Sequence, residues 1–556
     1  MTKRSTWLLL IGLTLLIFNP GKGETPALEK LFWQADFASV TAHFEKQDEK
    51  TLSLKDGLLW VECLARTGRS DLAGEKLQGL SAGIPPSSSI LAAEGSVYLA
   101  QGRREQAERA VAEALALEPV SEKAVLARVL LSLFSRDFAG AERWYGRLLG
   151  MIPEFRESFL VYFIGLELYS ARRDSQALRM LYEERASQWK GRDKKYADSL
   201  RANARLYQKA LKMPLFSAVG PLAEIAIPFA RNPGDSPSNV ILYKAEGFSY
   251  RVLLDTGNRA GWTIHNPELL RQLRSQQGGR ILSEIGTHPG LMEGSSIFTR
   301  KLEYEGLSLT GLPGLYVPKP QPEFYDANLN PSFIRNRVVT LDYVERQLRL
   351  SLPGISRPNL ARTTAERNGK IPWFGYRHVY VPVKVGGVDG LALIETGAKD
   401  ISLRLEFARR LGWSLTARTR YVATGEAVSY HVTPLRVTLG PFIFERDAAE
   451  VWPFQQLMDP LSGLIPDVVI GPEALAGSFI LTFDPFEGLL FLEKRESPDL
   501  SRSRQVSNNS GQEEGGGSPA FKAPPRRYRP CILSGASSAG RGKAGRLFPS
   551  GKSSGR

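Results

Sequence analysis

Two stretches decide the fold expected for this chain: Val252-Leu-Leu-Asp-Thr-Gly257 and Leu391-Ala-Leu-Ile-Glu-Thr-Gly397. They are one motif written twice, since in each an apolar run leads to an acid, a Thr and a turn-forming Gly. The two acids, Asp255 and Glu395, stand 140 residues apart. An acid placed after a buried strand in each of two repeats supplies one half of a water-activating carboxylate pair.

The repetition continues beyond the motif. Asp326-Ala-Asn-Leu-Asn330 follows Asp255 after 71 residues, and Asp467-Val-Val-Ile-Gly471 follows Glu395 after 72. Each copy then carries two apolar runs separated by a polar turn, which predicts paired β-strands. These runs cover residues 338–342 with 348–350, and 480–484 with 489–492. The shared order over two stretches of about 140 residues indicates an internal duplication.

These stretches resemble the retropepsin-like aspartic proteases, more closely the bacterial type with tandem lobes than the longer pepsins. Leu393-Ile-Glu-Thr-Gly-Ala398 is similar to the family signature with Glu in place of Asp, and Val468-Val-Ile-Gly471 is similar to its second signature. The first copy carries Asn330 where the second carries Gly471. The resemblance covers residues 237–495 and implies two retropepsin-like β-barrel lobes that form a pseudo-twofold pair.

The resemblance implies that Asp255 and Glu395 form the catalytic pair. Two carboxyl groups about 3 Å apart share one proton, so the ionised one takes a proton from water while the other polarises the scissile carbonyl. Glu395 is one methylene longer than the family's Asp, which moves its carboxylate by about 1.5 Å. Misplacement on that scale costs on the order of a hundredfold in rate. A catalytically inactive pseudoprotease that binds peptides is therefore the alternative.

The neighbouring residues support this pair in the same resemblance. Thr256 and Thr396 would hydrogen-bond across the interface, and Gly257 and Gly397 would permit a close backbone approach. Asn258 and Ala398 follow these glycines. Asn258 either hydrogen-bonds Asp255 and favours its charged form or merely tolerates the turn geometry. Gly471 would pack its strand behind the active turn.

Two Gly-containing stretches are candidates for flaps that cover a substrate. They span residues 286–294 and 421–430. The second is flanked by strand-like sequence, which also fits an ordinary hairpin.

The N-terminal third carries a 34-residue repeat. Small and turn-forming residues recur at this spacing: Ala73, Ala107 and Ala141, and Pro85, Pro119 and Pro153. Gly95 and Tyr98 stand where a tetratricopeptide repeat keeps its small and aromatic residues. Such repeats predict stacked helix pairs, an α-solenoid whose concave groove binds a peptide or protein partner. A folding support or spacer is the alternative role.

The two ends of the chain indicate where it acts. Lys3 and Arg4 precede the apolar run 7–18, which predicts a secretory signal peptide and a periplasmic or secreted protein. Residues 496–556 hold eleven Lys or Arg against four Asp or Glu, in a Gly/Ser/Pro-rich context that predicts a disordered basic tail. About half of the net charge of +14 lies there, so nucleic-acid binding by the folded part is not supported.

Five histidines and two cysteines without ligand spacing predict neither a metal nor an organic cofactor. No transmembrane segment is expected after signal cleavage. The sequence thus predicts a multidomain α plus all-β protein, and a homodimer is possible but not required. Its parts are a signal peptide (1–23), a helical repeat module (24–213), lobe 1 (214–355), lobe 2 (356–495) and the tail (496–556). The predicted function is an aspartic endopeptidase acting on proteins or peptides.

Overall fold

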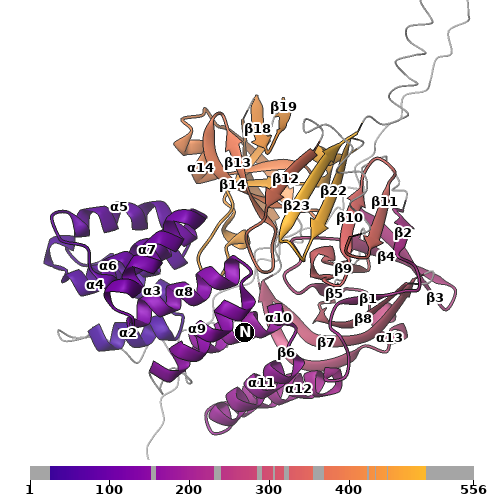
Figure 1. Cartoon of the computed structure of the whole chain (residues 1–556), viewed down its shortest axis with the longest axis horizontal. Helices are drawn as coiled ribbons and strands as arrows, with labels where there is room; N and C mark the ends of the chain where they lie inside the picture. The colour runs from indigo at the N-terminus through magenta and orange to yellow at the C-terminus, as the bar shows by residue number, and fades with distance from the viewer. Residues whose placement is uncertain are drawn as a thin grey trace, which may run out of the picture. The chain divides into compact units, whose positions relative to one another are not determined.

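The computed structural model describes most of the chain between residues 25 and 495 (Figure 1). The described ranges are 25–151, 158–230, 239–284, 291–304, 307–318, 325–354, 368–422, 425–432, 434–447, 449–476 and 478–495. The predicted signal peptide and basic tail lie outside them.

A helical region comes first and a β-rich region follows, as the sequence predicts. The helices are α2 (Thr25–Trp33), α3 (Phe37–Phe44), α4 (Leu54–Arg66), α5 (Ser70–Ser81), α6 (Ser88–Ala100), α7 (Arg104–Leu117), α8 (Glu122–Phe134), α9 (Phe138–Met151), α10 (Phe159–Arg172), α11 (Ser175–Trp189) and α12 (Lys194–Ala210). Several begin at a residue whose side chain accepts a backbone N–H, which fixes the helix start. Ser53, Ser87 and Ser158 do so for α4, α6 and α10.

The 34-residue repeat corresponds to helix pairs. Ala73, Ala107 and Ala141 lie on α5, α7 and α9, and all three are completely buried. A small residue at these positions lets the second helix of each pair approach its neighbours closely. The three alanines thus hold the same packing position in three successive helix pairs.

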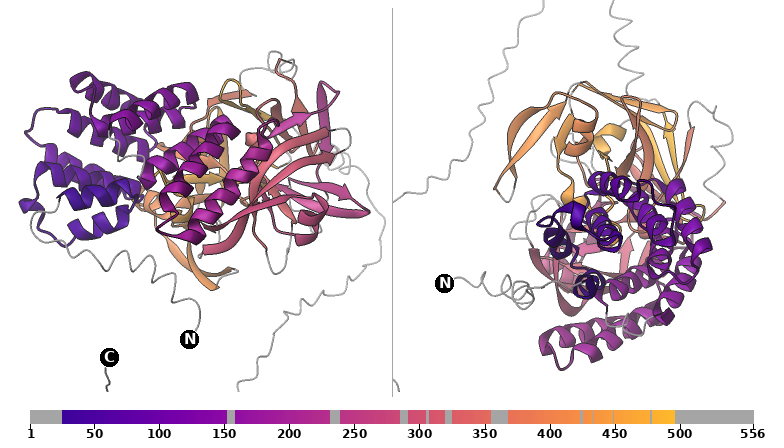
Figure 2. Two further views of the ribbon diagram at one scale, coloured as in Figure 1. Left: turned by 90° about the horizontal axis from the view of Figure 1, so that it is seen from below. Right: turned by 90° about the vertical axis from the view of Figure 1, so that its left-hand side faces the viewer.

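The first helix described, α2, packs against the helices of later repeats. Phe32 on α2 is completely buried, and the Lys123 Nζ on α8 lies 3.1 Å from the centroid of its ring. The Arg66 guanidinium carbon on α4 lies 5.5 Å from the same ring. The Ser158 hydroxyl, at the start of α10, donates to the carbonyl of Trp33. Figure 2 (right) shows the darkest helices inside the arc of the later ones, and these contacts place α2 against α4, α8 and α10.

The β-rich region contains two sheets with the same strand order. The first runs β3 (Val240–Ala245), β4 (Phe248–Leu254), β9 (Ala327–Leu329), β5 (Trp262–Ile264), β8 (Leu307–Tyr316), β7 (Leu291–Tyr304) and β6 (Gln276–Glu284), with β1 (Ser217–Val219) added to β8. The last runs β13 (Tyr380–Val385), β14 (Val388–Ile394), β21 (Val468–Ile470), β15 (Ile401–Arg404), β20 (Ala449–Trp452), β17 (Gly425–Val432) and β16 (Thr416–Val422), with β18 (Leu435–Leu439) and β19 (Phe442–Arg446) beyond β13. The short helices α13 (Pro267–Gln272) and α14 (Leu405–Arg410) follow β5 and β15.

A third sheet, here called the bridging sheet, joins the two copies. Its order is β12 (Asn368–Pro372), β23 (Leu489–Lys494), β22 (Phe479–Asp484), β10 (Val338–Asp342), β11 (Gln347–Ser351) and β2 (Glu224–Pro228). Both predicted hairpins are confirmed, as β10–β11 and β22–β23. They meet along β10 and β22, where Thr340 pairs with Thr482 and their hydroxyls lie 3.0 Å apart.

The helical repeats contact the β-rich region through the ends of their first helices. The backbone N–H of Gly375 donates to the carbonyl of Phe134, at the end of α8, over 2.7 Å. A Cβ added to Gly68, which follows α4, would lie 2.5 Å from Ile465, and one added to Gly102, which follows α6, would lie 2.8 Å from Leu391. These glycines therefore permit the backbone to press against the last sheet and its loops.

None of the helices in the described ranges is both long and apolar enough to cross a bilayer.

Candidate active site

Asp255 and Glu395 occupy equivalent places in the two copies. Each follows the last residue of a strand, β4 or β14, that runs parallel to a short neighbour, β9 or β21. The Asp255 N–H donates to the carbonyl of Leu329 over 2.8 Å, and the Glu395 N–H donates to that of Ile470 over 3.0 Å. Backbone hydrogen bonds to the neighbouring strand thus position each acid without the help of any side chain.

The two threonines interlock the turns, as predicted from the resemblance. The Thr256 N–H donates to the Thr396 hydroxyl, and the Thr396 N–H donates to the Thr256 hydroxyl, both over 2.9 Å. Each hydroxyl donates in turn to a carbonyl of the opposite strand, at Ile394 over 2.6 Å and at Leu254 over 2.7 Å. Both side chains are excluded from solvent, so these four bonds have no competition from water.

Each acid lies over the glycine of the opposite turn. A Cβ added to Gly257 would lie 1.9 Å from Oε1 and 2.0 Å from Oε2 of Glu395. One added to Gly397 would lie 2.5 Å from Oδ1 of Asp255. Since non-bonded carbon and oxygen cannot approach so closely, any other residue at either position would force the facing carboxyl to move. The structure therefore brings together the two carboxyls and both glycines that the sequence predicted.

The surroundings of the two acids differ. The Gly257 N–H donates to Oδ1 of Asp255 over 2.9 Å, and the Asn328 amide donates to Oδ2 over 3.0 Å. These donors stabilise a negative charge on Asp255. Burial raises the pKa of Glu395 well above its ordinary value, and the charge of Asp255 and a hydrogen bond between the two carboxyls raise it further. The Arg259 charge opposes this rise. The direction of this shift favours the protonated form of Glu395.

The pair is not sealed from water. Asp255 and Glu395 are both half-buried, and Gly397 is exposed. Solvent therefore reaches part of both residues.

One role suggested for Asn258 is wrong. Its amide donates to the carbonyl of Asn328 over 3.1 Å, and its Oδ1 accepts from Ala260 N–H and the Thr263 hydroxyl. Its side chain instead makes hydrogen bonds within its own turn, where the other prediction was only that it tolerates the turn geometry, and the side-chain amide that donates to Asp255 is that of Asn328. Ala398 closes the equivalent turn, where its N–H donates to the carbonyl of Glu395 over 3.0 Å.

Gly471 and Asn330 hold equivalent positions but act differently. A Cβ added to Gly471 would lie 2.8 Å from the Lys399 carbonyl, so the second copy needs Gly there. In the first copy the Asn330 side chain is completely buried, and its amide donates to the carbonyls of Thr256 over 2.9 Å and Asn258 over 3.2 Å. The missing glycine is thus replaced by a side chain that braces the active turn.

Two further residues that the sequence did not single out also tie the turns together. The Asn239 amide donates to the Thr396 carbonyl over 2.9 Å. The His378 ring lies with Nε2 3.3 Å from the Gly257 carbonyl and Nδ1 3.0 Å from the Tyr380 hydroxyl. Burial, followed by the charge of Arg259, lowers the pKa of His378 well below its ordinary value, so the ring is neutral. The 140-residue offset between the copies makes Asn239 equivalent to Val379, the residue after His378. No motif in the sequence marks Asn239 or His378 as a site residue.

The proposed flaps fall partly outside the described residues. Residues 286–290 of the first candidate and 423–424 of the second are not described. The strands of the second, β16 and β17, are paired as a hairpin from Thr416 with His431 to Val422 with Gly425.

The length of Glu395 can be tested directly. We expect Glu395→Asp to lower any turnover tenfold to a hundredfold, because the carboxylate would withdraw by about 1.5 Å from Asp255 and Gly257. The measurement is kcat on a peptide substrate, with the unfolding temperature as a check on folding. An increase in kcat would contradict this and would mean that the longer acid is misplaced.

Comparisons with known proteins give distant structural likenesses. No protein-family model matches the chain. No curated protein matches it either. A retropepsin-like aspartic protease from Rickettsia conorii is 25% identical with a TM-score of 0.17, over 23% of this chain and 90% of that one. Basic 7S globulin from soybean is 10% identical with a TM-score of 0.30, over 50% and 98%.

The helical part has a distant likeness of its own. A tetratricopeptide repeat protein from Parabacteroides merdae ATCC 43184 is 18% identical with a TM-score of 0.18, over 34% of this chain and 84% of that one. The chain is therefore distantly similar to a retropepsin-like aspartic protease and to a tetratricopeptide repeat protein.

Proposed function

We propose that this protein is an aspartic endopeptidase whose Asp255 and Glu395 activate one water molecule for peptide-bond hydrolysis. The observation that carries the proposal is the contact between these two half-buried carboxyls across interlocked turns. Two carboxyls in such contact cannot both ionise, so they hold one proton between them. Both come from one chain, so the site needs no second copy.

The different surroundings of the two acids assign their roles in this mechanism. Asp255 has the two donors that stabilise its charge, so it takes the proton from the attacking water. Glu395 holds the shared proton and donates a hydrogen bond to the scissile carbonyl, where negative charge develops. The hydrogen bonds between Thr256 and Thr396 hold both turns before the substrate binds, so the two carboxyls need no reorientation during the reaction.

We also propose the finer features of the architecture that the sequence predicts. The shared strand order of the first and last sheets, and the pairing of β10 with β22, support a pseudo-twofold pair of lobes bounded by residues 214–355 and 356–495. The apolar run 7–18 supports export to the periplasm or exterior. Because α2 packs against α4, α8 and α10, substrate recruitment by residues 24–213 would use other surfaces of the repeats or displace this helix.

A peptide library tests the proposed function. The purified protein is incubated with diverse peptides from acid to neutral pH, with and without a pepstatin-type inhibitor. We expect internal cleavage that the inhibitor blocks. Binding of peptides without cleavage at any pH would reject the enzyme and favour the pseudoprotease.

The raised pKa of Glu395 has a consequence for stability that does not depend on turnover. The folded protein keeps this proton at pH values where the unfolded chain, with a pKa of about 4.3, has released it. The protonated Glu395 therefore contributes fully to the free energy of unfolding below the unfolded pKa of about 4.3. This contribution is lost as the pH rises through the raised folded pKa. We expect the unfolding free energy of the wild type, relative to Glu395→Gln, to fall over this range, as measured by denaturant titration. A pH-independent difference would contradict the shift.

A further inference from the structure

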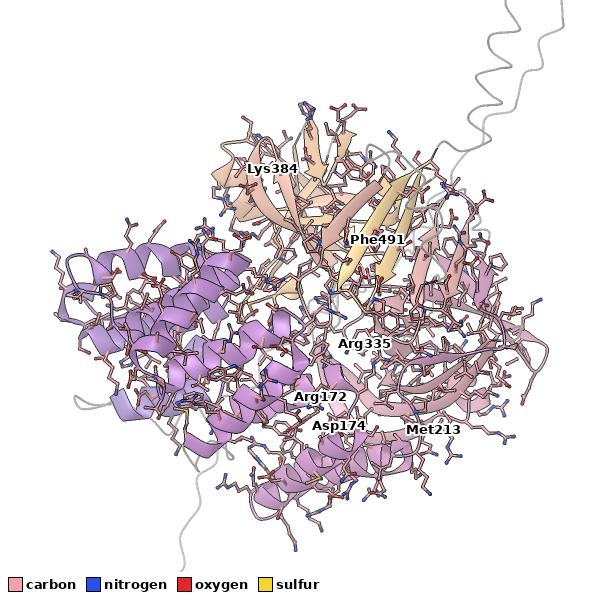
Figure 3. The ribbon with its side chains drawn as sticks, in the orientation of Figure 1. Arg172, Asp174, Met213, Arg335, Lys384 and Phe491 are labelled. Carbon is pink, nitrogen blue, oxygen red and sulfur yellow. The ribbon has the colours of Figure 1, made fainter. Side chains whose placement is uncertain are left out.

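Three arginines from separate segments converge where the repeats meet the β-rich region. Arg136 follows α8, Arg173 follows α10, and Arg335 follows a short 3-10 helix at Pro331–Phe333. The guanidinium carbons of Arg136 and Arg335 lie 5.7 and 4.7 Å from the centroid of the same Phe138 ring. Arg335 also donates to the carbonyl of Ala171, two residues before Arg173. Figure 3 labels Arg335 together with Arg172 and Asp174, the two neighbours of Arg173.

No carboxylate among the described residues forms an ion pair with any of these three arginines. Arg136 donates to the carbonyl of Pro485 over 3.3 Å, and Arg173 donates to those of Leu215 over 2.8 Å and Phe216 over 3.1 Å. Carbonyl oxygens satisfy donors without neutralising charge. Three like charges thus share one partly buried region, which costs stability unless an anion joins them.

The pKa values of the three arginines also indicate that no carboxylate neutralises them. Burial, followed by the charge of Arg335, lowers the pKa of Arg136 to about 9. Burial lowers the pKa of Arg335 to about 10. Burial and then the charges of Arg335 and Arg136 lower the pKa of Arg173 well below its ordinary value. In none of the three does a carboxylate oppose the change.

Two donors in the cluster are also unused. Nε of Arg335 and Nη2 of Arg173 are buried and have no hydrogen-bond partner among the described residues. A buried donor without a partner destabilises the folded state, and more so when it belongs to a charged group. Guanidinium donors that are left over in this way fit the oxygens of a bound anion.

The backbone adds a second, independent observation. Arg136 has φ of 64° and Arg173 has φ of 61°, in the left-handed region that favours glycine. Glycines fill the place of Arg136 in the two preceding repeats, since Gly68 and Gly102 stand at the same 34-residue spacing with φ of 77° and 71°. A residue with a Cβ is strained in this region relative to glycine. Strain retained at a position that has a ready glycine alternative points to a role for the side chain.

We propose that Arg136, Arg173 and Arg335 bind a phosphate-type oxyanion at the junction of the helical repeats with the β-rich region. Planar guanidinium forks match the geometry of phosphate oxygens, and a doubly charged anion offsets most of the charge of the cluster. Because the three side chains come from α8, α10 and the first copy of the β unit, the anion holds these segments together. The free ion and a phosphate monoester share this chemistry.

The test is binding and thermal unfolding of the full chain in inorganic phosphate, in O-phosphoserine and in chloride at equal ionic strength. We expect saturable binding and a raised unfolding temperature in one or both phosphate arms, and the tighter arm identifies the source of the anion. Binding should weaken at least tenfold in Arg335→Met. Arg172→Met is the matched control, because Arg172 is next to the cluster but pairs with Glu142. It should bind phosphate like the wild type.

A second variant keeps the proposal falsifiable if Arg335→Met unfolds. Arg136→Gly removes one charge and places glycine at a left-handed position, so it should be at least as stable as the wild type in chloride while binding phosphate at least tenfold more weakly. If phosphate binds no better than chloride, or if Arg136→Gly leaves phosphate affinity unchanged, the site does not exist. A merely structural clamp predicts instead that Arg136→Gly is less stable in chloride.

Discussion

Asp255→Asn is expected to lower kcat/KM for peptide cleavage by about 10⁴-fold while leaving the fold intact. Asn keeps the shape of the side chain, so the turn and its hydrogen bonds to Gly257 and Asn328 remain possible in altered form. It cannot take a proton from water. Glu395→Gln should have an effect of similar size, and the double variant should be little worse than either, because the two groups act as one unit.

The matched control is Asp389→Asn. Asp389 lies on β14, the strand that leads to Glu395, but its exposed side chain pairs with Lys384 over 2.8 Å at the far end of the hairpin. This change should alter kcat/KM less than twofold and the unfolding temperature very little. If Asp255→Asn cleaves as fast as the wild type, Asp255 is not the base and the proposed mechanism is wrong.

Gly257→Ala is expected to have the second largest effect. The added methyl would lie 1.9–2.1 Å from three atoms of the Glu395 carboxyl group, so the acid must leave its place beside Asp255. Displacement by an ångström or more costs on the order of a hundredfold in kcat, and crowding of this kind destabilises by about 1–3 kcal/mol. The backbone at Gly257 does not have a positive φ, so the clash with Glu395 is the main obstacle to alanine.

A second substitution that relieves the clash distinguishes it from a general loss of stability. Combining Gly257→Ala with Glu395→Asp shortens the obstructing acid, so the double variant should recover part of the lost stability. Gly79→Ala is the control for adding a methyl group, because nothing lies within 4 Å of a Cβ at that position on α5. It should stabilise by about 0.5–1 kcal/mol. Equal losses in Gly257→Ala with either acid at position 395 would contradict the steric explanation.

The sequence predicts those features that are written locally and repeated. Asp255 and Glu395 could be found because each follows a buried strand and precedes Thr and Gly in both copies. The paired runs around Thr340 and Thr482 predict hairpins for the same reason. Ala73 and its counterparts fix the helix pairs, because a small residue recurs at a constant spacing.

Other features depend on contacts between distant segments and leave no local pattern. The sequence does not reveal that the amide of Asn328, and not that of Asn258, donates to Asp255. This depends on the pairing of β9 with β4. The arginine cluster joins residues 136 and 335, which no periodicity connects. The burial of Phe32 likewise depends on the packing of α2 against α4 and α8.

The bridging sheet has a consequence for the timing of any activity. Its central contact joins Thr340 with Thr482, so one half of the sheet is made from the last strands described, β22 and β23. A nascent chain that has not yet released these strands cannot close the sheet that joins the two copies, and pairings between such distant segments form slowly. Under the proposed function, we therefore expect activity only after β22 and β23 have been synthesised, and none in a chain truncated before residue 479.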